Sequence, residues 1–472
     1  MSRKRKENII LSKILVIDAG SKGVCVGKAE DGKIVLIPNV VPGDVVDVKV
    51  FKKKSKYYEG IAIHFHEKSA NRIPPICSHF GYCGGCKWQN MQYEAQLKYK
   101  QNEVWNHLKR IGKITLPEIT PIVGSKDIFY YRNKMEFSFS DTKWLTPEQI
   151  ASEEVIDREH ALGFHIPKMW DKILDIDHCY LQPDPSNAIR NGLKAFCIQN
   201  QIPFYSPRQQ TGLMRSLMIR TSSIGEIMVL VQFYAPMEKE IAMVMGYLEQ
   251  NFPEITSLQF VINQKANDTI YDQEVVCFAG KNFIEEEMEG LKFKIQAKSF
   301  YQTNSKQAYE LYQITRDFAQ LSGKEVVFDL YTGTGTIALF VSKLAKKVVG
   351  VEAVADAIKD AEENAKNNQI SNCHFEVGDM KNVFNDEFFA RHGKPDVVIT
   401  DPPRDGMHAD VVAQLLKIEA PKIVYVSCNS ATQARDLALL DEKYEVQKIQ
   451  PVDMFPQTYH VENVVLLTQK NA

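Results

Sequence analysis

The sequence predicts a mixed α/β protein built from three parts. From about residue 305, near-continuous apolar strands alternate with helical segments, which is typical of a mostly parallel sheet covered on both faces. Residues 9–68 instead contain about five short strand patterns separated by turn residues, which favours a small β-barrel of OB type. A central α+β part lies between them. A chain of 472 residues is long enough for several such domains.

The N-terminal part begins with a basic tail at residues 1–8. The strand patterns ILVIDAG, GVCVGKA, KIVLIPN, DVVDVKV and YYEGIAIHF follow within residues 9–68, so we place the barrel there. The segment 52–58 mixes lysines with Tyr57 and Tyr58, and such rings can stack on nucleic-acid bases. A charged loop that only confers solubility is the alternative.

The central part combines a cysteine-rich loop with strand and helix patterns. A helix is predicted over residues 90–111, with Met91, Leu97, Val104 and Leu108 as its apolar stripe. Further on, the strand patterns KMEFSFS, LMIRTS, EIMVLVQFY and SLQFVIN occur with helices near 185–200 and 237–251. We therefore assign residues 69–92 and 125–285 to a central α+β domain, and residues 93–124 together with 286–472 to the C-terminal domain.

The C-terminal part alternates helix and strand in a regular order. A helix at 305–321 precedes the strands VVFDLY, KVVGVEA, CHFEVGD, PDVVITDPP, KIVYVSC and VVLLTQ, most of them separated by helices. In such sheets ligands bind beyond the carboxyl ends of the strands. The chemically informative motifs of this part all lie at such ends.

The net charge of −2 seems to exclude a strongly basic nucleic-acid binder, but it hides an asymmetry. Residues 1–134 contain 24 Lys+Arg against 12 Asp+Glu, whereas the remainder contains 33 against 47. A basic front part on an acidic back part indicates an anionic partner held at one end. No apolar run is long enough for a membrane span, and the N-terminus lacks a signal-peptide pattern. We expect a cytoplasmic protein.

A glycine-containing loop at the end of the first C-terminal strand indicates a nucleoside cofactor. The sequence DLYTGTGT leads from the strand into a helix, and Gly333 lets the backbone approach a ligand closely. Glu352 ends the second strand and can bind ribose hydroxyls, and Asp379 after the third strand can meet an adenine. Spacing alone also fits a dinucleotide. However, the third glycine of that fingerprint is missing and Asp329 would repel a pyrophosphate, which favours cationic S-adenosylmethionine.

Three motifs at later strand ends predict a catalytic site. The fourth strand ends in DPPR, Asp401 to Arg404, whose prolines stiffen the turn. The fifth ends in VSCN, which presents Cys428 as a candidate nucleophile. Near the C-terminus, His460 and Glu462 alternate on a predicted strand, so either could act as a base. A lone cysteine is more often inert core, but the neighbouring motifs favour a functional role here.

These parts fit methylation of uracil at carbon 5. Addition of a thiolate to carbon 6 makes carbon 5 nucleophilic, and a carboxylate must later remove the carbon 5 proton so that the cysteine is released. A base within folded RNA must also be flipped out of its stack.

At these residues the chain resembles the RNA uridine-5-methyltransferase family, which includes the 23S ribosomal RNA and tRNA enzymes. The resemblance covers nearly the whole chain and rests on SFYQTN, DLYTGTGT, DPPR, VSCN and FPQTYHVE. It implies a Rossmann-like S-adenosylmethionine-dependent methyltransferase domain, with Cys428 as nucleophile and Glu462 as base. Ser430 departs from the proline that many members have there. The positions that match cofactor-binding residues are Gln302, Tyr331, Thr336, Glu352, Asp379 and Asp401.

A cysteine group forms a second candidate site. Cys77, Cys83 and Cys86 have the spacing C-x5-C-x2-C, and Cys179 follows much later. Such thiolates commonly bind zinc or an iron–sulfur cluster, and spacing does not separate the two. The resemblance matches all four to a [4Fe-4S] cluster of the ribosomal RNA branch, whose N-terminal barrel is a TRAM domain.

The leading hypothesis is therefore methylation of a uridine in 23S ribosomal RNA by a monomeric enzyme. A tRNA uridine is the first alternative. Amino-group methylation of RNA bases is disfavoured because Arg404 stands where an aromatic residue is usual, and cytosine-5 methylation because its nucleophile usually lies in other settings. An iron–sulfur RNA-binding protein without catalysis is a different class, which the intact Cys428 and Glu462 disfavour. The basic residues of YRNK (131–134), Arg215 and Arg220 could position phosphates or serve structure.

Overall fold

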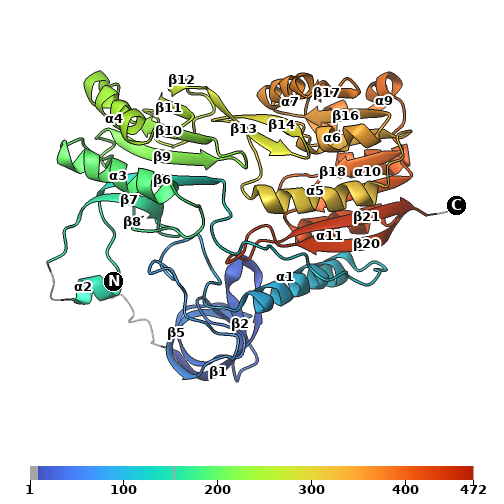
Figure 1. Ribbon diagram of the computed structural model, residues 1–472. Coiled ribbons are helices and arrows are strands. Elements are labelled where there is room, and N and C mark those ends of the chain that lie inside the picture. The colour runs from blue at the N-terminus through green and yellow to red at the C-terminus, as the bar shows by residue number, and fades with distance from the viewer. Residues whose placement is uncertain (1–8, 153–154, 471–472) are drawn as a thin grey trace, which may run out of the picture.

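The computed structural model describes residues 9–152 and 155–470, and it divides into three bodies (Figure 1). A barrel lies at the bottom of the view, a sheet with two helices at the upper left, and a larger helix-covered sheet on the right. The predicted basic tail at 1–8 lies outside the described residues. Among the residues that are described, none of the helices has the length and apolar character needed to cross a membrane.

The N-terminal barrel has the predicted five strands and is closed, in the order β1-β2-β3-β5-β4. Alternate β-branched residues such as Val16, Val35 and Val48 point inward and are buried, as the two-residue period of a strand requires. At Gly60 a Cβ atom would lie 2.4 Å from Val48 Cγ1, so the closed wall needs a glycine there. The strands are β1 (Ile10–Ala19), β2 (Cys25–Lys28), β3 (Ile34–Ile37), β4 (Val45–Lys53) and β5 (Tyr57–Glu67).

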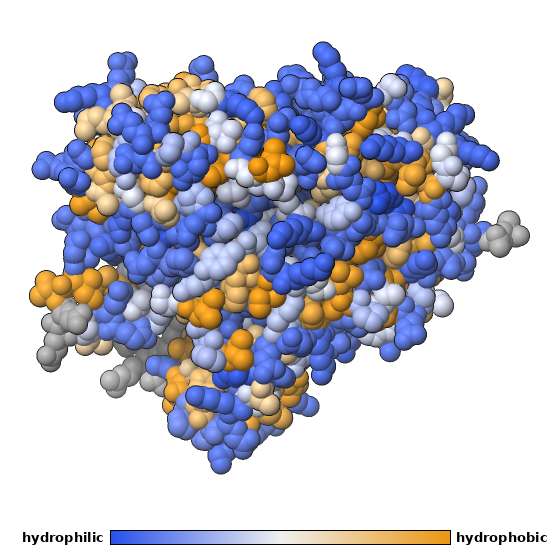
Figure 2. Space-filling model, viewed as in Figure 1, coloured by the Kyte–Doolittle hydropathy of each residue, from blue (hydrophilic) through white to orange (hydrophobic). Residues whose placement is uncertain are grey.

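The face of the molecule shown in Figure 2 is mostly hydrophilic, with apolar side chains in small patches. Several of the exposed apolar side chains lie on barrel strands β1 and β5. They are Leu15, Ile17, Ile61 and Ile63.

The central body is a seven-stranded sheet in the order β12-β11-β10-β9-β6-β7-β8, and helices α3 and α4 pack on one face. The four predicted strands and both predicted helices are confirmed. Three further strands were not predicted: β8 is short, β12 is largely exposed, and β7 (EHALGFH) contains no β-branched residue. The elements are β6 (Lys134–Thr142), α2 (Pro147–Ala151), β7 (Glu159–His165), β8 (Ile173–Asp175), α3 (Ser186–Gln199), β9 (Met214–Thr221), β10 (Ile227–Phe233), α4 (Glu238–Asn251), β11 (Ser257–Ile262) and β12 (Val275–Gly280).

The C-terminal sheet has the order β17-β16-β15-β18-β19-β21-β20, parallel except where β21 pairs with β19 and β20. All six predicted strands are confirmed, and the edge strand β20 is additional. The strands are β15 (Val326–Leu330), β16 (Lys347–Glu352), β17 (Cys373–Val377), β18 (Val397–Thr400), β19 (Lys422–Ser427), β20 (Tyr444–Val452) and β21 (Glu462–Gln469).

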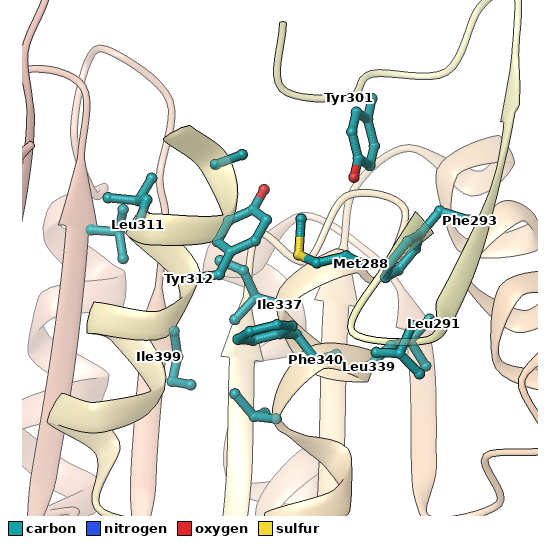
Figure 3. Packing of buried hydrophobic residues seen from close by; sticks show 14 of the residues in the cluster. Met288, Leu291, Phe293, Tyr301, Leu311, Tyr312, Ile337, Leu339, Phe340 and Ile399 are labelled. Carbon is teal, nitrogen blue, oxygen red and sulfur yellow. The ribbon is translucent and has the colours of Figure 1, made fainter. Parts of the chain in front are cut away.

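Helices cover both faces of this sheet, with one buried cluster on each side. On one side Tyr312 of α5 lies beside Ile337 and Phe340 of α6 (Figure 3), with the rings of Tyr312 and Phe340 6.1 Å apart. The hairpin β13 (Phe283–Met288) and β14 (Leu291–Gln296) joins this cluster. The helices are α5 (Ser305–Ala319), α6 (Thr336–Val341), α7 (Ala355–Asn367), α8 (Met380–Val383), α9 (Asp386–His392), α10 (Ala409–Ile418) and α11 (Ser430–Leu440).

Helix α1 (Tyr93–His107) connects the barrel to the C-terminal sheet. It begins three residues later than predicted and ends in a π-helical turn, Leu108–Gly112. The chain after it runs along β20, where Val123 pairs with Val452 in a parallel bridge. The segment 93–124 therefore packs against the C-terminal sheet rather than the central one.

Candidate functional site

The loop after β15 has the backbone conformation of a nucleoside-binding turn. Tyr331, Gly333 and Gly335 all have positive φ, at 65°, 57° and 78°. A Cβ atom on Gly335 would lie 2.9 Å from Ala361 Cβ, so only glycine lets the loop lie this close to α7. Thr336 then begins α6, which points its N-terminus at the mouth of the sheet.

Glu352 lies beside this loop at the end of β16. Its carboxylate accepts hydrogen bonds from the backbone N–H of Gly333 at 3.2 Å and of Val354 at 3.0 Å. Asp379 follows β17, is exposed, and caps α8 by accepting from Lys381 N. Two of the predicted carboxylates therefore follow one another on the same side of the loop, in an order that suits a ribose and an adenine.

Asp329 braces the loop from beneath rather than facing solvent. It is buried, and Oδ2 accepts from Thr332 Oγ1 at 2.5 Å and from Ala338 N at 3.1 Å, while Oδ1 has no partner among the described residues. Burial, the foremost cause, raises the pKa of Asp329 to about 7. A cationic ligand above the loop would favour the ionised form of this carboxyl, whereas a pyrophosphate would be repelled by it.

The strand registers bring the predicted catalytic residues together. Ser427 pairs with Asn463 in the antiparallel ladder of β19 and β21, so the next pair outward is Cys428 beside Glu462. Asp401 follows Thr400, which is paired with Leu330 at the end of β15. The nucleophile candidate, the base candidate and Asp401 therefore meet at one edge of the sheet.

The pKa values show how strongly these groups interact. Burial raises the pKa of Glu462 to about 8, helped by the charge of Asp401 and opposed by Arg404. Burial likewise raises the pKa of Asp401 to about 7 and that of Cys428 to about 11, the latter also through Glu462 and Asp401. Acidic groups that perturb one another in this way are typical of catalytic sites.

The turn that carries Arg404 is tied to the nucleophile loop. Asn429 caps α11 by accepting from Ala431 N, and its Nδ2 donates to Arg404 O at 2.8 Å. Cys428 thus stands just before a helix N-terminus, whose dipole stabilises a thiolate. Ser430 is the residue that departs from the family pattern. Its Oγ lies within hydrogen-bonding distance of His107 Nδ1, at 2.8 Å, and so joins α1 to the loop.

The prediction that His460 and Glu462 share a strand is wrong. Strand β21 begins at Glu462, and His460 lies in the preceding loop, where its backbone N–H donates to Thr458 Oγ1. Burial, then the charges of Arg404 and other cations, lower the pKa of His460 to about 4. Glu462 is 7 % exposed and begins an inner strand of the sheet, so it does not belong to an exposed terminal strand.

The loop 453–461 that leads to Glu462 is held by buried polar contacts that the sequence reasoning missed. Lys100 of α1 forms an ion pair with Asp453 at 2.6 Å, and neither side chain is exposed to solvent. Tyr93 OH donates to the same carboxylate at 2.8 Å. Gln96 and Gln457 exchange hydrogen bonds through Gln96 Nε2 and Gln457 N. The sequence signal for these contacts was the four-residue spacing of Gln96, Lys100 and Val104, which places all three on one face of the helix, and this face is buried.

Other contacts connect this loop to each body of the protein. Asn304 and Gln307 at the start of α5 donate to Met454 O and Asp453 O. Gln302 lies next to them, and its carbonyl accepts from Asn133 Nδ2 at 2.9 Å. The predicted SFYQTN segment therefore connects the central sheet to the catalytic edge.

The four predicted cysteine ligands line one cavity of about 370 Å³ between the cysteine-rich loop and the central sheet. Burial raises the pKa of all four thiols, and it raises those of Cys83 and Cys86 to about 12. Neighbouring thiols of the set raise the pKa values of Cys77, Cys83 and Cys86 further. Gln89 Nε2 donates to Cys86 Sγ at 3.2 Å. Within residues 9–152 and 155–470, no three His, Cys, Asp or Glu side chains form a group that could hold a single metal ion.

Arg215 and Arg220, two candidate phosphate ligands, have structural partners. Both are buried; Arg215 donates to Asn263 O and Lys265 O at 2.7 Å, and Arg220 to Ser299 O at 2.7 Å. Arg132 lies elsewhere, at the cysteine cavity, with its guanidinium 5.1 Å from the Phe455 ring.

The fold and the site together define a Rossmann-like S-adenosylmethionine-dependent methyltransferase with an N-terminal RNA-binding barrel. The family model for tRNA (uracil-5-)-methyltransferase matches residues 221–470, and the model for the TRAM domain matches residues 13–63. The chain belongs to this RNA uracil-5-methyltransferase family, and its substrate is RNA.

Relatives and a solved structure agree with this assignment over nearly the whole chain. An RNA methyltransferase of Bacteroides thetaiotaomicron is 53% identical over 95% of this chain and 99% of its own length, and one of Chlorobaculum tepidum is 38% identical over 98% and 96%. The crystal structure of Pyrococcus abyssi tRNA (uracil-54, C5)-methyltransferase in complex with S-adenosyl-L-homocysteine has a TM-score of 0.74 and 28% identity, covering 96% of this chain and 100% of that one.

The raised pKa of Glu462 predicts a pH-dependent cost to folding. Its pKa rises from 4.5 to about 8 on folding, so the folded state binds the proton more tightly, and stability falls as pH rises from about 4.5 to about 8. Glu462→Gln removes this cost. Without cofactor, the variant should gain stability over the wild type between pH 5 and pH 8, measured by urea unfolding.

Glu94→Gln, on the exposed face of α1, is the matched control and should show no such pH-dependent gain. An equal stability difference for Glu462→Gln at both pH values would contradict a buried, proton-binding carboxyl.

Proposed function

We propose that this enzyme methylates carbon 5 of a uridine in 23S ribosomal RNA through a covalent adduct between Cys428 and carbon 6. The convergence of Cys428, Glu462 and Asp401 at one sheet edge carries the proposal. All of these residues come from one chain, so the site needs no second subunit, in line with a monomer.

The cofactor-binding residues fit S-adenosylmethionine, which supplies an electrophilic methyl group when bound. Glu352 would hold the ribose, Asp379 the adenine, and Tyr331, Gly333 and Thr336 form the loop beneath. Gln302 and Asp401 complete the set from the other side. The Asp329 carboxyl under the loop, whose Oδ1 has no partner among the described residues, can ionise in response to a sulfonium but would be opposed by a phosphate.

The protein residues divide the proton chemistry between them. Cys428 adds to carbon 6 as a thiolate. The N-terminus of α11 and Arg404 favour this form, whereas burial and the charges of Glu462 and Asp401 oppose it, so the thiolate forms when those carboxyls are protonated. Protonated Asp401 can donate a hydrogen bond to a uracil carbonyl, because its pKa is about 7. Once carbon 5 carries the methyl group, Glu462 removes its proton, and the electron pair expels the thiolate from carbon 6.

Two observations bear on the choice of RNA. The four-cysteine set together with the TRAM barrel resembles the ribosomal RNA branch, which favours 23S ribosomal RNA. The full-length likeness to the Pyrococcus abyssi tRNA (uracil-54, C5)-methyltransferase favours a tRNA uridine as the second candidate.

We further propose that Cys77, Cys83, Cys86 and Cys179 hold a [4Fe-4S] cluster. A single zinc ion with Zn–S bonds of about 2.3 Å needs sulfurs about 3.8 Å apart. The four thiols line one cavity of about 370 Å³, which has room for a cluster, and within the described ranges they are not arranged as a closed group of metal ligands. Binding would displace the thiol protons that burial retains.

The covalent mechanism predicts opposite results for two substitutions. Cys428→Ala should abolish methyl transfer and the adduct with RNA containing 5-fluorouridine, because no thiolate reaches carbon 6. Glu462→Gln should transfer the methyl group yet accumulate a protein–RNA adduct on ordinary uridine RNA, because the carbon 5 proton stays in place. Denaturing gels with labelled RNA measure both.

Cys373→Ala, a cysteine on β17 in the same sheet, is the control and should behave as the wild type. Methyl transfer by Cys428→Ala would contradict the nucleophile, and the absence of an adduct in Glu462→Gln would assign the base elsewhere.

The cluster proposal predicts the metal content of protein purified without oxygen. The wild type should be brown, with about four iron and four sulfide per chain. Cys83→Ser should lose this iron, whereas Cys277→Ser, an exposed thiol outside the cavity, should retain it. Colourless protein that contains only zinc would contradict the proposal.

A further inference from the structure

A second cavity lies on the central sheet, apart from both sites described above. Its volume is about 300 Å³, large enough for a nucleic-acid base. Strands β6 and β9 form its floor, and the end of β7 and the loops around Trp170, Tyr205 and Asp268 form its walls. The lining combines aromatic rings with a few polar groups. The catalytic mechanism uses none of these side chains.

The wall at residues 263–268 is rigid without any ligand. Arg215 holds the carbonyls of Asn263 and Lys265, each at 2.7 Å, and its guanidinium lies 4.9 Å from the Tyr205 ring. Gln232 Nε2 donates to Asp268 O at 3.2 Å. A cavity whose walls are fixed in advance loses little entropy when a ligand enters.

Trp170 is held in solvent at the mouth of this cavity. It is 67% exposed, and among the described aromatic side chains only Tyr271 and Phe300 are more exposed. It lies in the tight turn between β7 and β8, where Ile166 N donates to Lys172 O and Met169 N to Ile166 O, both at 2.9 Å. An exposed indole on a turn held by backbone hydrogen bonds, at the mouth of a cavity, is a platform on which a base can stack.

The charges around the cavity favour a base edge over a phosphate. The charged side chains of its lining are Arg215 and Asp268. The Arg215 guanidinium is occupied by the carbonyls of Asn263 and Lys265. The Asp268 carboxylate is exposed to solvent and makes no hydrogen bond or ion pair with any described residue. Such a carboxylate repels phosphate but accepts hydrogen bonds from the N–H groups of a base.

The cavity lies on a path between the barrel and the catalytic edge. Lys168 belongs to the same turn as Trp170, and its charge lowers the pKa of Glu59 on β5, although Lys52 lowers that pKa more. The Trp170 turn therefore lies near the barrel. In the other direction, β6 runs from Asn133, which contacts Gln302, to Ser138 in the cavity floor. At about 3.3 Å per residue this distance is about 17 Å, which several nucleotides of unpaired RNA can span.

We propose that this cavity binds one unpaired base of the RNA substrate, several nucleotides from the target uridine, by stacking on Trp170 and hydrogen bonding to Asp268. The carboxylate selects bases that carry an exocyclic amino group, such as cytosine, over uracil. The inference rests on RNA being the substrate, but not on the identity of the catalytic nucleophile.

The test is binding of the full chain to fluorescein-labelled oligouridine with and without one central cytidine, followed by fluorescence anisotropy. The wild type should prefer the cytidine oligonucleotide. Trp170→Ala should weaken its binding at least about fivefold, the lower end of base–aromatic stacking. Trp170→Phe should retain most of the affinity. Asp268→Asn should shift the preference towards uracil, because an amide both donates to and accepts from the uracil edge.

Phe278→Ala, an exposed aromatic on the far edge strand β12, is the matched control and should bind as the wild type. Equal affinity of the wild type for both oligonucleotides, or wild-type binding by Trp170→Ala and Asp268→Asn, would overturn the proposal. Methylation assays on the same variants separate this result from the proposed function. Variants that still methylate RNA and keep the wild-type base preference would contradict the cavity proposal but not the proposed function.

Discussion

The buried ion pair between Lys100 and Asp453 is the interaction on which the arrangement of the site depends. It joins the helix that follows the barrel to the loop that leads into Glu462, and both side chains are fully buried at 2.6 Å. Removing one partner of such a pair costs about 3–5 kcal/mol, because the other charge stays buried. Tyr93 and the Phe455 backbone N–H satisfy the remaining acceptor positions of Asp453. The position of the Glu462 carboxyl therefore depends on a helix that lies outside its own sheet.

The same loop brings the functions of the three bodies together. Lys87 and Trp88, next to the cysteine-rich segment, donate their backbone N–H groups to Gln457 O at 2.8 and 3.0 Å. Tyr131 of the central body donates to Pro456 O at 2.8 Å. A change in the cysteine cavity or the central sheet can thus reach the catalytic edge through backbone contacts. The net charge near zero is the sum of a basic part, residues 1–134 with 24 Lys+Arg against 12 Asp+Glu, and an acidic remainder with 33 against 47.

The sequence was sufficient for the elements whose signals are local. Apolar periodicity predicted the five barrel strands and the six main strands of the C-terminal sheet, and motifs at strand ends predicted that Cys428 and Asp401 would meet. Glu462 was correctly predicted on a strand. The start of that strand is set by its pairing with the end of β19 at Ser427, which the sequence does not show, so His460 was wrongly placed on the strand. The Lys100 pair was missed because a lysine on a helix usually faces solvent, and its partner lies 353 residues away. The strands β7 and β12 form through pairing with their neighbours rather than through their own composition.

The central claim is that the carbon 5 proton of uracil is exchanged for a methyl group at the edge formed by Cys428 and Glu462. Release of tritium from RNA labelled at carbon 5 of uridine tests it most directly, with 23S ribosomal RNA and tRNA transcripts as parallel substrates and labelled methyl donor in the same reaction. The account predicts one tritium released for each methyl group transferred to the ribosomal RNA. Methyl transfer without release of tritium would contradict methylation at carbon 5.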